Sequence, residues 1–304
     1  MVKLLLKVLP YSIFIKTYYN FFSIRKRKYL RHDSFKKFKN LESLNLKKYK
    51  SSSKIFIIGS GASINKITKR QWQEINENDS FGFNFSFINR DHTPTFYASE
   101  AMAGIDLNTS GRSPVAEKFY TEFKKERERF KNVPKILSDL EPDRLQHFLN
   151  YGRDVLDENL YLVNTVNGLA RTSSEFKQLI KFYKSKGIFD KKTHIDEVFK
   201  FRATLSMAIS LSINLGYEEI ILCGIDLNDP RYFYQDKNMY PDTPAFRSSP
   251  NTPKHSTLFK RELYVSIDEV VKYMNLEICK PKNIKLFVQN PDSALSNFLN
   301  TYKI

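Results

Sequence analysis

A glycine-serine-glycine turn lies within the run "KIFIIGSGASI" at residues 54–64, whose first half consists of strand-forming residues. Such a turn after a strand is typical of the phosphate loop of a nucleotide-binding sheet, where backbone N–H groups bind a phosphate. This turn has two glycines where the dinucleotide fingerprint has three, and it lacks the Lys-Ser/Thr pair of a P-loop. The sequence therefore predicts a phosphate-binding turn that belongs to neither class.

Asp226 and His255 stand where they can act on a bound ligand. Asp226 comes directly after an apolar strand predicted at 220–224 and Ile225. The carboxyl ends of parallel strands meet in one crevice, so we expect Asp226 near the glycine turn, although an aspartate at a strand end also serves as a helix cap or turn former. His255 separates a long loop from a predicted helix, where catalytic groups concentrate. A lone histidine is more often structural or merely exposed, so both interpretations stay open.

The potential metal ligands form no metal-binding pattern. Cys223 and Cys279 have neither a disulfide pattern nor a metal spacing. The histidines are scattered, without a His-x-x-x-His pair, and there is no Asp-x-Asp motif. We therefore expect no metal and no other cofactor, and an anionic ligand must be neutralised by protein groups. The five histidines are His32, His92, His147, His194 and His255.

Strand and helix patterns alternate after residue 53, and this order predicts a parallel sheet with right-handed crossovers. We therefore expect an α/β fold over residues 54–304: a single Rossmann-like, GT-A-like nucleotide-binding domain whose parallel sheet is flanked by helices. The expected strands are 54–60, 79–88, 94–99, 133–138 and 220–224, and the expected helices are 62–76, 201–215 and 256–274.

Two segments stand apart from this alternation. Residues from about 113 to 200 are charged and helical, and we expect a helical insertion around a short strand. Residues 228–254 contain five prolines, no glycine and a dense aromatic group. Loops of this length tend to be lids or disordered segments, and the aromatic content favours a lid that closes over a ligand.

Basic charge is concentrated in residues 1–50, which hold 14 Lys and Arg against two acidic residues, a net charge of +12 out of +16. The charge-free stretch at 8–15 is too short to cross a bilayer, which takes about 20 residues. A cleavable signal is not expected, because the first alanine is Ala62. Apolar and aromatic clusters between the lysines favour a basic amphipathic segment that associates with membrane lipid. A basic arm for nucleic acid is the alternative.

Several stretches resemble one enzyme family. "GYEEIILCGIDLNDPRYFY", then "HST", then "KLFVQNPDSALSNFL" are similar to segments of the bacterial sialyltransferases of glycosyltransferase family 42, the lipooligosaccharide sialyltransferase type. "FIIGSGASI" is similar to that family's nucleotide loop, and "GFNFSF" to its second strand. The likeness covers roughly 54–100 and 200–300. It implies an inverting, metal-independent transfer of sialic acid from CMP-sialic acid to a cell-surface glycan, lipooligosaccharide or capsule.

The resemblance also implies roles for individual residues. His255 stands in the place of the family's general base, and Arg202 in that of an arginine before the "GID" strand. The tyrosine that binds the leaving phosphate matches Tyr234; an earlier lid tyrosine falls on Asn228, and whether Tyr232 repairs that departure stays open. The nucleotide contacts match Gly59, Ser60, Gly61, Ser63, Asn84, Asp226 and Asn228.

Two departures from the family lie near the expected position of the donor sugar's carboxylate. Ala98 replaces an asparagine, and Leu205-Ser206 replaces a Ser-Gly pair. Ser99, Thr204 and Ser206 are polar neighbours that can take over the contact. The departures leave open another CMP-linked acidic sugar as donor: Kdo, legionaminic acid or pseudaminic acid.

The resulting hypothesis is a sialyltransferase in the cytoplasm, peripheral on the inner face of the cell membrane. Its expected partners are a CMP-sugar donor, a glycan acceptor and membrane lipid, without nucleic acid; a homo-oligomer, the acceptor and the linkage stay open. A hypothesis of another class is a non-catalytic basic protein that binds nucleotide or RNA.

Overall fold

The computed structural model describes residues 6, 8–30, 38–100, 114–138, 156, 159–190, 195, 197–244 and 254–303. Within these residues, the main sheet has nine strands, and every neighbouring pair is parallel. The expected Rossmann-like α/β fold is therefore confirmed. In spatial order the strands are β1 (Lys39–Asn40), β6 (Leu160–Leu162), β5 (Lys135–Ser138), β4 (Phe96–Glu100), β3 (Asp79–Phe83), β2 (Lys54–Ile58), β9 (Glu219–Cys223), β10 (Lys285–Val288) and β11 (Asn300–Thr301).

The strand order reverses between β2 and β9. From β2 the chain runs outward through β3, β4, β5 and β6, whereas β9, β10 and β11 extend the sheet on the other side of β2. In open parallel sheets the ligand crevice lies outside the carboxyl ends of the strands at such a switch point. The topology therefore directs attention to the residues that follow β2, β3 and β9.

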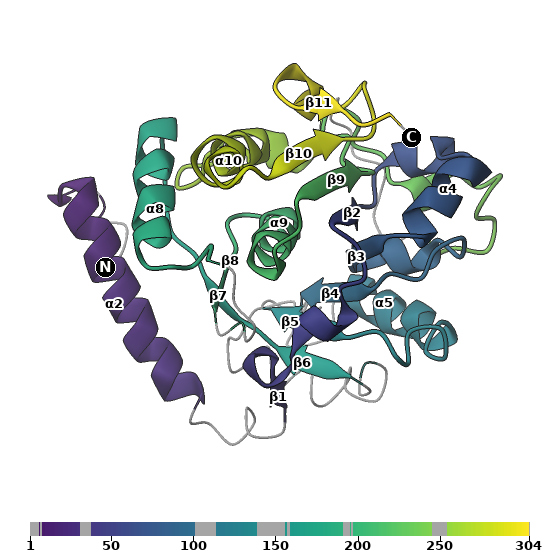
Figure 1. Cartoon of the computed structure of the whole chain (residues 1–304), viewed down its shortest axis with the longest axis horizontal. Coiled ribbons are helices and arrows are strands. Elements are labelled where there is room, and N and C mark those ends of the chain that lie inside the picture. The colour runs from purple at the N-terminus through teal and green to yellow at the C-terminus, as the bar shows by residue number, and fades with distance from the viewer. Residues whose placement is uncertain are drawn as a thin grey trace.

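Both faces of the main sheet are covered, which explains why residues 55–58 of β2 and 220–223 of β9 are all apolar. On β2, Ile55 and Ile57 join one hydrophobic cluster, and Phe56 and Ile58 join the other. Figure 1 shows the helices on the two sides of the sheet. The first cluster includes residues of α8 (Ser173–Ser185), α9 (Thr204–Leu215) and α10 (Ile267–Met274), and the second those of α4 (Lys69–Asn76) and α5 (Pro114–Lys125).

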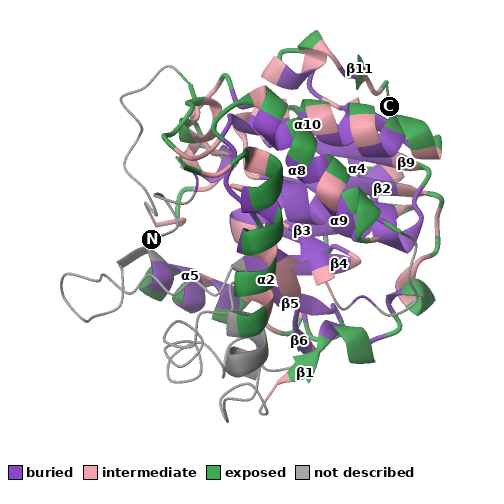
Figure 2. Ribbon diagram, turned by 90° about the vertical axis from the view of Figure 1, so that its left-hand side faces the viewer, coloured by how far each residue is buried: buried purple, intermediate pink, exposed green. Residues whose placement is uncertain are grey.

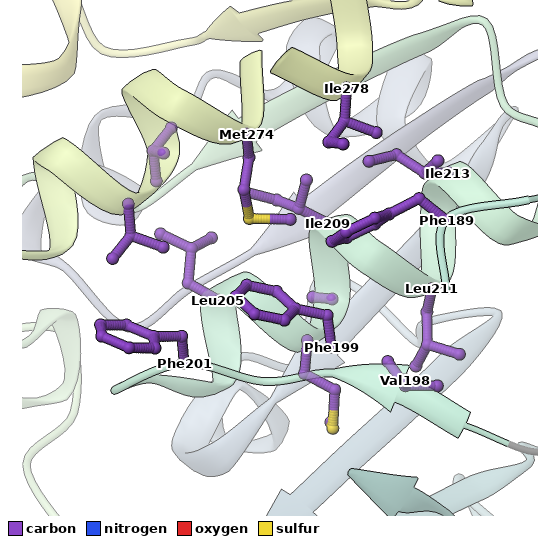
Figure 3. Close-up of a cluster of buried hydrophobic side chains, with 14 of the residues drawn as sticks. Phe189, Val198, Phe199, Phe201, Leu205, Ile209, Leu211, Ile213, Met274 and Ile278 are labelled. Atoms are coloured by element: carbon purple, nitrogen blue, oxygen red, sulfur yellow. The ribbon is translucent and has the colours of Figure 1, made fainter. Parts of the chain in front are cut away.

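Helix α9 is the central helix of the first cluster, and all its residues are buried. Leu205 and Ile209 pack together with Phe199 of β8 (Glu197–Phe199) and with Met274 of α10 (Figure 3). The helix ends at Gly216, as expected, because this residue adopts a left-handed φ of 76° that glycine tolerates without strain. This packing fixes the amino-terminal end of α9 beside the carboxyl ends of the central strands.

Three expected elements are wrong in extent. The helix expected at 62–76 is split into a short 3-10 turn, η3 (Ala62–Lys66), and α4, because Thr68 caps α4 in a capping box with Gln71. The strand expected at 79–88 stops at Phe83, because Asn84 has a left-handed φ of 52° and begins the 3-10 turn η4 (Asn84–Ile88).

The third is the long helix expected at 256–274, which begins only at Ile267. Before it lie a 3-10 turn, η6 (Ser256–Leu258), and an irregular segment. Arg261 and Tyr264 exchange two backbone hydrogen bonds of 3.0 and 3.1 Å, so these groups are not free to form a helix. Ser266 then starts α10 with its own capping box.

The segment from about 113 to 200, expected as a helical insertion, contributes more than helices. Besides α5 and α8, it supplies β5 and β6 to the main sheet and β7 (Asn164–Val166) to a second, two-stranded sheet with β8. Residues 141–158, which form part of the expected helical insertion, lie outside the described residues, apart from Leu156.

The amino-terminal segment and the expected lid are partly described. Helix α2 (Tyr11–Leu30) lies beside α8 at the edge of the molecule (Figure 1). Across the described ranges, none of the helices combines the length and the apolar content that a membrane crossing takes. In the expected lid, η5 (Phe233–Gln235) is packed into the domain, and residues 245–253 lie outside the described part.

Candidate active site

A cavity of about 260 Å³ lies at the carboxyl ends of β2, β3 and β9, at the switch point of the sheet. A second cavity, of about 610 Å³, adjoins it and shares four lining residues: Asp226, Asp229, Arg231 and Tyr232. The structure thus brings together most of the predicted site residues. The first cavity is lined by Ser60, Gly61, Asn84, Arg202, Thr204, Asp226, Tyr232 and His255, and the second adds Ser63 and Asn228.

Four predicted site residues do not line either cavity: Gly59, Ser99, Ser206 and Tyr234. Ser99 is buried within β4. Ser206 is buried in α9, where its hydroxyl accepts a hydrogen bond from the backbone N–H of Phe201 at 2.8 Å. Of the two departures from the resembled family, Leu205 lines the first cavity, whereas Ala98 is buried in β4.

The glycines of the "GSGAS" turn bind the neighbouring strand. The N–H groups of Gly59 and Gly61 donate to the carbonyls of Cys223 and Gly224, each at 2.8 Å. A Cβ on Gly61 would lie 2.5 Å from Oδ2 of Asp226 and 2.7 Å from the Gly224 carbonyl oxygen. Both glycine positions are therefore required by the close approach of β2 to β9, and their N–H groups are not free for a phosphate.

Asp226 joins three loops at the floor of the site. Its Oδ2 accepts a hydrogen bond of 2.8 Å from the backbone N–H of Ser63, and its Oδ1 accepts one of 2.8 Å from Asn290. The side chain is only 4% exposed. This carboxylate therefore holds the turn after β2 against the loop after β10, and its interactions fit the interpretation of a turn former.

Three buried side-chain oxygens at the site lack a hydrogen-bond partner among the described residues. They are Oδ1 of Asn84, beside the first cavity, and Oγ of Ser63 and Oδ1 of Asn65, beside the second. Buried polar groups in native structures are nearly always hydrogen-bonded, and the exceptions tend to be functional. The Asn84 oxygen is thus available to a ligand in the first cavity, and the Ser63 and Asn65 oxygens to a ligand in the second.

His255 is held from both sides of its ring. Its Nδ1 lies 2.8 Å from Oγ1 and 3.3 Å from the backbone nitrogen of Thr257, and its Nε2 lies 3.3 Å from the Tyr232 hydroxyl. The backbone N–H of His255 donates to the Leu227 carbonyl at 2.8 Å, which ties the histidine to the segment after β9. The position expected from the sequence, beside the crevice and at the end of the 228–254 segment, is therefore the position found.

The two lid tyrosines have different environments. Tyr232 is half-buried, lines both cavities and faces His255. Tyr234 is 2% exposed and packs in the second hydrophobic cluster, where its ring lies 5.5 Å from that of Phe85. The two rings stack on each other with centroids 5.3 Å apart. Of the two tyrosines, Tyr232 lines the cavities and Tyr234 does not.

Arg202 binds the segment that carries His255. Its guanidinium donates to the carbonyls of Val265 at 2.6 Å and Ser256 at 3.2 Å, and also to that of Phe259. Burial and the nearby Arg261 lower the pKa of Arg202. Its φ of 67° is left-handed, and α9 begins two residues later, without a side-chain cap on its first turn. Arg202 therefore acts on the site by holding the 256–265 segment next to this helix end.

Sequence reasoning missed three residues at the site: Thr257, Asp229 and Arg231. Arg231 lines both cavities, and its guanidinium is bound by the Asp229 carboxylate, with a contact of 2.8 Å between Nη2 and Oδ2. This hydrogen bonding lowers the pKa of Asp229 and raises that of Arg231. The signal was present in the "NDPRY" stretch, since an arginine beside aromatic residues in a predicted lid is a candidate to bind an anion.

No metal site is found at this crevice. Within the ranges that the structure describes, no cluster of His, Cys, Asp and Glu side chains has the arrangement to hold a metal ion. Both cysteines are buried and free, and burial raises the pKa of the Cys223 thiol well above its usual range. The groups that the described residues place at the site are imidazole, hydroxyl, guanidinium, amide and carboxylate groups.

Neither a protein-family model nor a curated protein matches this chain. Among solved structures, it is similar to the monofunctional alpha-2,3-sialyltransferase Cst-I from Campylobacter jejuni, at 16% sequence identity and with a TM-score of 0.44. That similarity covers 83% of this chain and 82% of the other.

Proposed function

We propose that this chain is an inverting glycosyltransferase that transfers sialic acid from CMP-sialic acid to a cell-surface glycan, without a metal, and that His255 is the general base. The observation that carries the proposal is the position of His255. Its ring stands at a cavity at the switch point of the sheet, with Nδ1 bound by Thr257 and Nε2 directed to the Tyr232 side of that cavity.

The base must have a free lone pair on the nitrogen that meets the acceptor. When Nδ1–H donates to the Thr257 hydroxyl, the lone pair of the neutral ring is on Nε2. Nε2 then takes the proton of the acceptor hydroxyl as the acceptor oxygen bonds to the anomeric carbon. The bond from that carbon to the phosphate breaks, CMP leaves, and direct displacement inverts the configuration. A positioned general base contributes about 10²- to 10⁴-fold in rate.

The departing phosphate gains negative charge and needs donors. The Tyr232 hydroxyl and the Arg231 guanidinium both line the two cavities and supply such donors. The N–H groups of Gly59 and Gly61 do not, because they bind the strand beside them. In this proposal the glycine turn shapes the site, and the lid side chains neutralise the phosphate.

The donor's carboxylate is assigned to the end of the first cavity where α9 begins. Ala203, Thr204 and Leu205 line that end, and the amino terminus of a helix favours a negative charge. Asn84, with its available Oδ1, stands at the same cavity and can accept from a sugar hydroxyl.

A different acidic sugar is the second candidate donor. Leu205 presents an apolar side chain to the cavity where the resembled family has a serine. This favours testing CMP-linked Kdo, legionaminic acid and pseudaminic acid beside CMP-sialic acid. A donor with a methyl or other apolar substituent near its carboxylate would gain from this contact.

The test is release of CMP from CMP-sialic acid, with a galactoside acceptor and a chelator present. We expect turnover by the intact chain, its loss in His255→Ala, and its retention in Lys260→Ala, a control on the same segment with an exposed side chain. Binding of CMP without turnover of any CMP-sugar would reject the transferase and leave a nucleotide-binding protein. Absence of CMP binding would reject the nucleotide assignment.

A further inference from the structure

Helix α2 has two apolar faces, and only one of them is used by the fold. Phe14, Ile15 and Tyr18 are buried and belong to the first hydrophobic cluster, which the residues of α8 also join. The Tyr11 hydroxyl donates to the Leu169 carbonyl at 2.5 Å and fixes the start of the helix on the domain. Helix α2 is therefore packed on the domain and is not a free arm.

The second face looks away from the domain. Ile13 is 50% exposed, Phe21 41% and Ile24 63%, and the exposed Lys16 lies among them at helical spacing. Val8, just before the helix, is 70% exposed. Figure 2 shows the exposed positions of α2 along the outer side of the molecule. We call Ile13, Phe21 and Ile24 the outer apolar face.

This concentration of exposed apolar side chains is unusual for the molecule. Seven large hydrophobic side chains are exposed among the described residues, and three of them make up the outer apolar face of α2. Scattered exposed apolar residues need no explanation, whereas a group on one helix marks an interaction surface.

We propose that the outer apolar face docks on the surface of a bilayer that contains anionic lipid, with α2 lying in the plane of the headgroups. The segment of residues 1–50 carries a net charge of +12, and α2 runs on through the sequence Arg-Lys-Arg-Lys at 25–28. Apolar side chains immersed at the boundary and basic residues held against acidic headgroups are the two contributions that bind an interfacial helix.

Charge also decides between lipid and a second copy of this chain. Two such helices face to face would bring two segments of +12 together, which opposes association. Anionic headgroups neutralise the same charge. Nucleic acid would neutralise the charge but offers little to the aliphatic side chains of Ile13 and Ile24.

The consequence is a fixed orientation for the catalytic domain. Because Phe14, Ile15 and Tyr18 hold α2 on the domain, a bilayer bound to the opposite face of this helix sets the tilt of the whole sheet. The cavity would then be presented to the membrane surface at one constant angle. This goes beyond the proposed transferase activity and does not depend on it.

The test is flotation of the full chain with vesicles of phosphatidylcholine, with and without phosphatidylglycerol. We expect binding only to the anionic vesicles, weakened by salt, and a loss of about tenfold or more in Ile13→Asp/Ile24→Asp. Met239→Asp/Leu276→Asp, which changes two exposed apolar residues elsewhere, is the matched control and should bind like the unchanged chain. All four positions are exposed, so we expect equal thermal unfolding temperatures.

Three outcomes would overturn the proposal. Equal binding of the two double variants would show that the outer apolar face is not the contact. A dimer in solution that Ile13→Asp/Ile24→Asp dissociates would assign the face to a second copy. The chain could also bind single-stranded RNA more tightly than anionic vesicles, with no effect of Ile13→Asp/Ile24→Asp. The basic charge of residues 1–50 would then serve to bind nucleic acid.

Discussion

Oγ1 of Thr257 lies 2.8 Å from Nδ1 of His255, closer than the 3.3 Å between that nitrogen and the backbone N–H of Thr257. The two contacts favour opposite tautomers. The backbone N–H can only donate, so it requires a lone pair on Nδ1 and leaves the proton on Nε2. The hydroxyl can also accept, so it permits Nδ1–H and frees Nε2 to act as a base. The Thr257 hydroxyl therefore decides whether Nε2 of His255 has the lone pair that a general base needs.

Thr257→Val should remove this competence and keep the shape of the side chain. With only the backbone N–H left at Nδ1, the proton moves to Nε2, and we expect kcat to fall about tenfold to hundredfold with little change in KM for the donor. Thr257→Ser should restore most of the rate. Nitrogen chemical shifts of His255 report the tautomer directly. If they are the same in the unchanged chain and in Thr257→Val, the hydroxyl does not set the tautomer.

Tyr232→Phe and Tyr234→Phe separate the two lid tyrosines. Tyr232 lines both cavities, so loss of its hydroxyl should lower kcat about tenfold to hundredfold while donor affinity changes less. Tyr234 lies in the hydrophobic cluster, and its change should alter stability more than turnover. Steady-state kinetics and thermal unfolding of both variants provide the comparison. A larger kinetic loss in Tyr234→Phe would reverse the assignment.

The ion pair of Asp229 and Arg231 predicts opposite effects from its two members. Arg231→Gln should weaken CMP binding by roughly tenfold, since a charged donor is lost. Asp229→Asn should strengthen it a few-fold, because the guanidinium no longer has to leave a carboxylate to bind phosphate. Both side chains are partly exposed, 72% for Arg231 and 30% for Asp229, so the effects are screened and should shrink with salt.

Calorimetric titration of CMP at two ionic strengths measures both effects. Lys237→Gln is the matched control, because Lys237 is an exposed cation of the same loop that lies outside both cavities. If Asp229→Asn binds CMP more weakly than the unchanged chain, then Arg231 does not have to leave Asp229 to bind the phosphate. In that case Asp229 itself contacts the ligand.

Five strands of the main sheet, β2 to β5 and β9, were predictable from sequence because they contain short apolar runs that are buried on both faces. Ile55 to Ile58 illustrate this, since alternate residues enter opposite clusters and none can be polar. The strands β1, β6, β10 and β11 were not expected, because they are only two to four residues long. The helix expected at 256–274 was not predictable in extent, because tertiary hydrogen bonds decide it. The guanidinium of Arg202, distant in sequence, binds carbonyls that a helix would have used.

The order of strands and helices predicted the position of the site better than the glycine motif did. Asp226 was expected near the glycine turn because strand ends converge in one crevice, and His255 was expected at that crevice because it ends the predicted lid. Both residues line the first cavity. What the glycines do was not predictable: Gly61 is required because Asp226 and Gly224 leave no space for a Cβ, which is a contact between distant segments. Ser99 and Ser206, chosen because they are polar neighbours in sequence, line neither cavity.

His92 predicts the pH dependence of stability in the acid range. Its Nδ1 lies 2.6 Å from Oδ1 of Asn76, its Nε2 lies 2.8 Å from Oγ of Ser80, and its ring stacks on Trp72. Burial, with a smaller contribution from Arg129, lowers the pKa of His92 to about 4. In the unfolded chain a histidine titrates near ~6.5. Between these values the unfolded state binds the proton and the folded state does not, so the free energy of unfolding must fall as the pH falls.

The decline should begin below about pH 6.5 and amount to about 2 kcal/mol from this residue by pH 5. His92→Gln keeps hydrogen-bonding groups and cannot titrate; it should be less stable than the unchanged chain at pH 7, because the stacking on Trp72 is lost. Between pH 7 and pH 5 the difference in the free energy of unfolding between the two proteins should become about 2 kcal/mol smaller, since the acidic residues affect both proteins equally. Urea unfolding at several pH values measures the free energy of unfolding of both proteins. Two parallel curves would mean that His92 is protonated in the folded protein at its ordinary pKa.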